Sequence, residues 1–151
     1  MHQRDYILRI IEQLGSVLAE LRRRILGRQA NPAAIERDLA GLAGESGMDL
    51  ELLRRFSPDT LRMFVAPSGE VEPARCWITA ELLYLDGLLA RAESREEDAL
   101  ASLTKARLLF TLIEPGGGML LGFPEAASRI EEIDAIPDSA GSLPADREDG
   151  S

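Results

Sequence analysis

Residues 78–114 have the sequence ITAELLYLDGLLARAESREEDALASLTKARLLFTLIE, and this stretch decides the fold. Its apolar residues recur at helical spacing on both sides of a short charged break, as expected for two consecutive α-helices. Gly87 in the first half, and Ala99 and Ala106 in the second, are small enough to let two antiparallel helices cross closely. The stretch therefore predicts a helical hairpin.

The ends of the hairpin helices are also marked in the sequence. Glu72-Pro73 opens the first helix, because proline at the first helical position loses no backbone hydrogen bond. Ser94 and Glu97 have the spacing of a capping box, in which each side chain binds the backbone N–H of the other residue. The second helix is therefore predicted to begin at Ser94, and the whole hairpin to cover residues 73–114.

The hairpin resembles one tetratricopeptide repeat, a helix–turn–helix unit that stacks on neighbouring copies and binds partner proteins. Five residues fit the small and large apolar positions of the repeat: Gly87, Ala99, Ala106, Leu83 and Leu103. Three depart from it: Asp86 where the family prefers leucine, Ala90 where it prefers tyrosine, and Pro115, which comes a turn late. Because no second copy is evident, the resemblance implies a single tetratricopeptide-like hairpin within a small helical domain.

Further helices are predicted on both sides of the hairpin. Asn31-Pro32 and Ser57-Pro58 are signals of a cap followed by a proline, and Asp49 is an acidic cap. The predicted helices outside the hairpin cover residues 5–26, 32–45, 49–56, 58–65 and 124–136. No stretch alternates like a β-strand. We therefore expect one all-α domain of about seven helices over residues 5–136, and a disordered acidic tail at residues 137–151.

Composition excludes several classes of function. The chain has 151 residues, a formal net charge of −9 and a pI near 4.7, so its surface would repel the phosphates of nucleic acid. Cys76 and His2 are its only cysteine and histidine, which excludes an internal disulfide and a zinc cluster of Cys and His ligands. The sequence shows no signal peptide and no apolar run of membrane-spanning length, so a cytoplasmic location is expected.

The N-terminal helix is the main candidate for a binding surface. Residues 1–28 carry six arginines against three acidic residues, although the chain as a whole is acidic. Residues 5–28 form an amphipathic helix with a heptad-like seam, the candidate partner interface: Ile7, Ile11, Leu14, Leu18, Leu21 and Ile25. The seam would bind a protein partner or a second copy, or pack on the protein's own hairpin, and the sequence leaves both alternatives open.

The arginines of this helix suggest another alternative, association with a membrane surface. Arg22, Arg23, Arg24 and Arg28 are candidate contacts to a membrane or another anion, because basic amphipathic helices lie on anionic bilayers. The acidic body and the absence of Trp and Phe from the helix favour a simpler role, in which arginines satisfy carbonyls at the helix end.

The sequence gives little support for catalysis, a metal or a cofactor. Gly116-Gly117-Gly118 lacks the lysine and hydroxyl of a phosphate-binding loop, so it is predicted to be a plain turn. Cys76 stands beside Trp77 on an apolar helix face and is expected to be buried and unreactive. The remaining alternative is an enzyme or small-ligand binder. It would need Asp86 or Glu81 in a pocket, whereas Asp86 is expected to face solvent.

The chain as a whole resembles a group of short, uncharacterised bacterial proteins. The resemblance rests on DYILRIIEQL at residues 5–14 and ELLYLDG at residues 81–87. It implies an N-terminal amphipathic helix and a C-terminal tetratricopeptide-like hairpin, and it assigns no activity, cofactor or catalytic residue. The sequence thus predicts a non-enzymatic protein–protein interaction or scaffolding module, with the N-terminal helix as its candidate surface for self-association.

Overall fold

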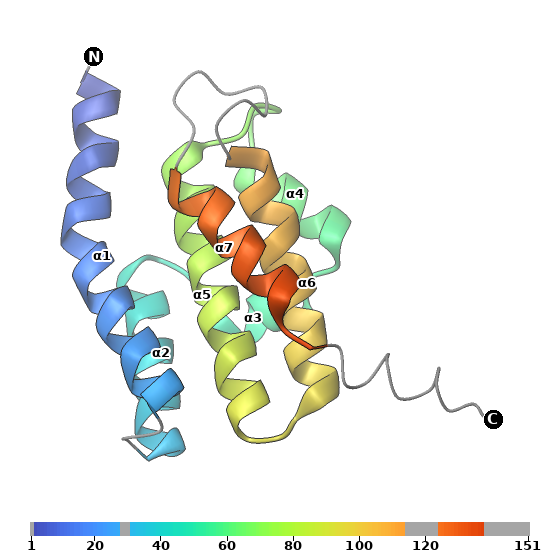
Figure 1. The fold of residues 1–151 in the computed structure, drawn as a ribbon. Coiled ribbons are helices and arrows are strands. Elements are labelled where there is room, and N and C mark those ends of the chain that lie inside the picture. Colours follow the sequence, from blue (N-terminus) through green and yellow to red (C-terminus); the bar gives the residue numbers. More distant parts are fainter. Residues whose placement is uncertain (1, 28–30, 114–123, 138–151) are drawn as a thin grey trace.

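The computed structural model describes residues 2–27, 31–113 and 124–137, and these ranges contain seven α-helices and no strand. The predicted all-α class with about seven helices is therefore confirmed (Figure 1). The helices are α1 (His2–Gly27), α2 (Pro32–Glu45), α3 (Leu50–Arg55), α4 (Pro58–Val65), α5 (Pro73–Ala92), α6 (Glu96–Ile113) and α7 (Pro124–Ala135). The predicted turn at residues 116–118, and the acidic tail from residue 138 onward, lie outside the described residues.

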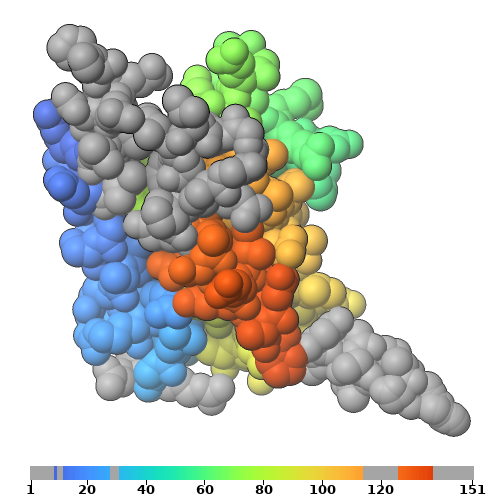
Figure 2. Space-filling model, turned by 45° about the horizontal axis from the view of Figure 1, so that its top comes forward, coloured from blue at the N-terminus to red at the C-terminus, as the bar shows by residue number. Residues whose placement is uncertain are grey.

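Helix α5 forms the centre of the molecule. Every residue from Cys76 to Ala90 is buried, on all faces of the helix. A helix that is buried all round must be surrounded by other elements, and α1, α2, α3, α4 and α6 all contact it. Helix α7 packs on α6 and, in Figure 2, lies on the surface between α1 and α6 with α5 largely hidden behind it.

Helices α5 and α6 form the predicted hairpin and cross closely at Gly87. A Cβ atom added to Gly87 would lie 2.6 Å from Cγ of Leu103 and 3.2 Å from its backbone nitrogen. Ala99 and Ala106, the other small residues of the predicted crossing, are buried. The close helix–helix approach that these small residues predicted is therefore present.

The turn between α5 and α6 differs from the prediction at Ser94. Ser94 has φ of 63°, in the left-handed region, and its N–H donates to the carbonyl of Arg91 at 3.0 Å. The next N–H, of Arg95, donates to the carbonyl of Ala90 at 2.8 Å, which completes a Schellman motif. The predicted capping box with Glu97 is wrong, because Ser94 closes α5 and does not open α6.

Ser94→Gly is expected to stabilise the protein by about 0.5–1 kcal/mol. The left-handed conformation costs a non-glycine residue about 1–2 kcal/mol, and the greater freedom of glycine in the unfolded chain offsets part of the gain. Gly47, which ends α2 in the same motif with φ of 78°, offers a reciprocal control, since Gly47→Ser should destabilise. Urea unfolding followed by circular dichroism measures both changes, and a neutral or destabilising Ser94→Gly contradicts this account.

The other predicted caps are confirmed. Asn31 accepts a hydrogen bond from the N–H of Ala33 at 2.7 Å, Asp49 from that of Glu51 at 3.0 Å, and Ser57 from that of Thr60 at 3.1 Å. Helix α1 begins at His2, three residues before its predicted start. Local capping chemistry therefore fixes where α2, α3 and α4 begin.

Candidate functional site

The candidate interface on α1 is divided by the fold. Leu18, Leu21 and Ile25 are buried in the core, where α1 packs on α5 and α2, and Leu14 is half-buried. The side chains of Ile7 and Ile11 lie outside the described residues. Of the two alternatives that the sequence left open, packing on the protein's own hairpin therefore holds for the carboxyl-terminal half of the seam.

Three arginines near the carboxyl-terminal end of α1 are bound to carboxylates of the same chain. The ion pairs are Arg22–Glu132 at 2.9 Å, Arg23–Glu20 at 2.6 Å and Arg24–Asp38 at 2.9 Å. Arg28 lies outside the described residues. A membrane lipid or another anion would have to compete with these three carboxylates. The described part of the chain contains no helix that is long and apolar enough to cross a bilayer.

A cluster of polar side chains, the Tyr84 cluster, joins α1, α5 and α7. Its members are Tyr84, Glu81, Arg22, Arg129 and Glu132. The hydroxyl of Tyr84 donates to Glu132 and accepts a hydrogen bond from Nε of Arg22 at 2.9 Å. Nε of Arg129 lies 3.3 Å from the buried carboxylate of Glu81, and its guanidinium lies over the Tyr84 ring. Burial raises the pKa of Tyr84 to about 12, so the phenol stays protonated well above neutral pH.

A second cluster surrounds Asp86, which is buried and not solvent-facing as predicted. Nη2 of Arg54 lies 2.7 Å from the Asp86 carboxylate, and the hydroxyl of Ser102 donates to it at 2.7 Å. Burial alone would lower the pKa of Arg54, but hydrogen bonds to Asp86 and Glu36 raise it above its usual range. The prediction was wrong because Arg54 of α3 and Ser102 of α6 both reach this face of α5. Asp86, which departs from the repeat pattern, therefore forms a buried ion pair with Arg54.

These contacts bear on the alternative of an enzyme or small-ligand binder. Asp86 and Glu81 are both bound to arginines, Asp86 to Arg54 and Glu81 to Arg129. Cys76 is buried as predicted, its Sγ lies 3.3 Å from the carbonyl oxygen of Leu109, and burial raises its pKa to about 12. The thiol is therefore protonated at neutral pH, which disfavours its use as a nucleophile. Among the residues described, no group of three or more His, Cys, Asp or Glu side chains is placed to hold a metal ion.

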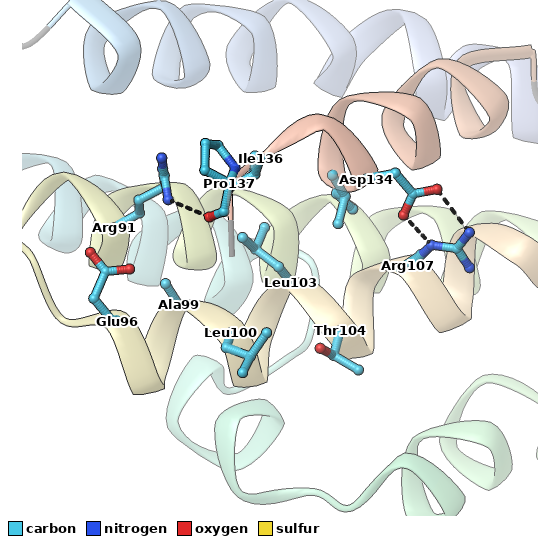
Figure 3. Close-up of a pocket in the computed structure, with 11 residues that line it drawn as sticks. Arg91, Glu96, Ala99, Leu100, Leu103, Thr104, Arg107, Asp134, Ile136 and Pro137 are labelled. Atoms are coloured by element: carbon cyan, nitrogen blue, oxygen red, sulfur yellow. Dashed lines mark hydrogen bonds and ion pairs between the residues drawn. The ribbon is translucent and has the colours of Figure 1, made fainter. Parts of the chain in front are cut away.

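An open groove runs between α6 and the end of α7 (Figure 3). It has a volume of about 270 Å³ and is lined by Arg91, Glu96, Ala99, Leu100, Leu103, Thr104, Arg107, Ile133, Asp134, Ile136 and Pro137. Leu100 is 49% exposed at its edge, while Ala99 and Leu103 are buried beneath it. Sequence reasoning missed this α6–α7 groove, because it exists only where α7 lies along α6. Leu100 is the one exposed large apolar residue of α6 in the described part of the chain.

Comparisons with known proteins add no further constraint on the site. No family model matches the chain, and no curated protein or solved structure matches it. The resemblance to a group of short bacterial proteins and the tetratricopeptide-like character of the hairpin therefore stay predictions. The candidate site must be judged from its own contacts, burial and charges.

Proposed function

We propose that the protein is a non-enzymatic interaction or scaffolding module that self-associates through the amino-terminal half of α1. The observation that carries the proposal is the arrangement of α1 and α2, because α2 runs beside the carboxyl-terminal half of α1 (Figure 1). The buried residues of α1 in the described part, Leu18, Leu21 and Ile25, belong to that half. In the sequence, Ile7 and Ile11 continue the same apolar face toward the amino terminus.

The expected association is weak enough to respond to dilution. Full burial of one isoleucine side chain contributes about 1.5–3 kcal/mol, and a pair of α1 helices would bury Ile7 and Ile11 from each copy. Bringing two chains together costs about 4–15 kcal/mol in lost freedom, which consumes most of that gain. Two copies should therefore exchange between monomer and dimer as their concentration changes.

Ile7→Gln combined with Ile11→Gln should abolish the self-association. Both substitutions keep good helix formers on α1 but remove its apolar face, so the mass measured by light scattering should fall to the 16.5 kDa of one chain. The unsubstituted protein should show a higher mass that rises with concentration. Substitutions are preferable to removing the first 28 residues, because that deletion would take Leu18, Leu21 and Ile25 out of the core.

Leu26→Gln is the matched control for this experiment. Leu26 is 54% exposed at the other end of the same helix, so losing it should leave the self-association intact. Circular dichroism would confirm that all variants keep their helix content. A protein that stays monomeric at every concentration, or a double variant as large as the unsubstituted protein, would refute self-association through α1.

Other contacts favour an interaction module over the alternatives. Asp86 and Glu81, which an enzyme or ligand site would need, are engaged by Arg54 and Arg129. The pairing of Arg22, Arg23 and Arg24 with carboxylates of the same chain weakens the case for a membrane surface. The proposal includes a cytoplasmic location, which the free, buried thiol of the only cysteine supports.

A further inference from the structure

We infer that the α6–α7 groove binds one helix of a partner protein, an amphipathic helix that places apolar residues against Leu100 and a carboxylate against Arg91. This inference adds a second surface and a class of partner to the proposed interaction function. It does not depend on self-association through α1. Three properties of the groove support it: its direction, its apolar wall and the arginine at one end.

The direction of the groove fits a helix. The residues that α6 contributes are Glu96, Ala99, Leu100, Leu103, Thr104 and Arg107, which share one face of the helix. They span about three turns, or roughly 16 Å of helix axis. Side-chain ridges at this spacing complement those of another helix, which is how helices pack in the grooves of partner proteins.

The wall of the groove is suited to apolar side chains of a partner helix. Leu103 of α6 and Ile136, which directly follows α7, lie on its two sides (Figure 3), Ile133 also lines it, and Leu100 is 49% exposed. A cavity of about 150 Å³ lined by apolar residues is large enough to bind benzene. The groove, at about 270 Å³, therefore has room for two apolar side chains from successive turns of a partner helix.

The two arginines of the groove differ in their partners. At one end, Arg107 donates to both oxygens of Asp134, at 2.7 and 2.9 Å, so the arginine is already neutralised. At the other end, Arg91 donates to the carbonyl of Pro137 at 3.4 Å and has no carboxylate partner within the described ranges. Glu96 lies at that end on the α6 side (Figure 3). A carboxylate on the partner helix would supply a counter-ion for Arg91.

The inference can be tested by selecting helices that bind the protein and comparing their sequences. A stable three-helix scaffold with one randomised outer face would be displayed as a library and selected on the full chain, and in parallel on Arg91→Glu. On the unsubstituted protein, selected helices should carry apolar residues three or four positions apart and Asp or Glu at one end. On Arg91→Glu, the residue at that end should change to Lys or Arg, because a charge reversal exchanges the preferred partner charge.

Leu100→Lys shows whether the selected helices bind in the groove. It should weaken their binding about tenfold or more, as expected for an exposed apolar anchor, while Met63→Lys on α4 should change nothing. Both residues are exposed, so neither change should alter thermal unfolding. Binding unaffected by Leu100→Lys, or an end-charge preference unchanged by Arg91→Glu, would overturn the inference. Repeating the selection with Ile7→Gln and Ile11→Gln separates this result from the failure or success of α1 self-association.

Discussion

Arg54→Met is expected to lower the free energy of unfolding by about 3–5 kcal/mol, because it leaves the carboxylate of Asp86 buried without its counter-ion. The Asp86 side chain is 4% exposed, and Arg54 donates to it from Nη2 at 2.7 Å and from Nε at 3.1 Å. After the substitution, the hydroxyl of Ser102 would be the one described side-chain group that still donates a hydrogen bond to this carboxylate. A desolvated charge that keeps one neutral donor destabilises the folded state far more than the loss of an exposed ion pair.

Removing Asp86 as well should restore part of the lost stability. The double variant Arg54→Met, Asp86→Leu contains no buried charge at this position, so it should be more stable than Arg54→Met alone. Arg95→Met provides the comparison with an exposed arginine, since Arg95 is 40% exposed in its pairs with Glu93 and Asp98. That change should cost less than about 1 kcal/mol.

Urea unfolding of the three variants measures these differences. The informative comparison is between the double variant and Arg54→Met alone, because it isolates the effect of the Asp86 carboxylate left buried without a counter-ion. If the double variant were the less stable of the two, the stability would come from packing around Arg54 and not from its charge. A loss for Arg54→Met as small as that for Arg95→Met would contradict the role given to the Asp86 cluster.

Gly87→Ala should destabilise the protein by about 1–3 kcal/mol, although alanine is the better helix former by about 1 kcal/mol. The new Cβ would lie 2.6 Å from Cγ of Leu103 and 2.7 Å from its Cδ2, so α5 and α6 would have to move apart or Leu103 change rotamer. The backbone nitrogen of Leu103, at 3.2 Å from the same Cβ, limits how far the helices can adjust. Thermal unfolding should show a lower midpoint for this variant.

Gly41→Ala is the matched control, because nothing lies within 4 Å of a Cβ at that helical glycine. There the gain in helix propensity should act alone, stabilising the protein by up to about 1 kcal/mol. Leu103→Ala should cost less in the Gly87→Ala background than in the original chain, since it removes the atoms that clash. If both glycine variants were equally stabilised, the close crossing at Gly87 would be incorrect.

The sequence predicted the features that depend on neighbouring residues. Asn31-Pro32 and Glu72-Pro73 identified the starts of α2 and α5, because caps and prolines act within one helical turn. Gly87 identified the hairpin crossing, because a missing side chain inside an apolar helix is informative without knowledge of its partner. These signals gave the helical class and the central hairpin.

The sequence could not predict contacts between distant segments. Arg54 and Asp86 are 32 residues apart, and nothing local indicates that α3 brings one to the other. Ser94 has the spacing of a cap for α6, but it instead takes part in the Schellman motif that ends α5. The α6–α7 groove depends on where the last helix lies, which the sequence of α6 does not reveal.

The burial of α5 has a consequence for how the chain acquires its structure during synthesis. Glu81 and Tyr84 of this central helix find their partners Arg129 and Glu132 on α7, 48 residues further along. While the ribosome has not yet released α7, Glu81 lacks that arginine and one side of α5 remains uncovered. Shortened chains that end before α7 should therefore stay dependent on chaperones, and the native state should form in one late, concerted step after the last helix has emerged.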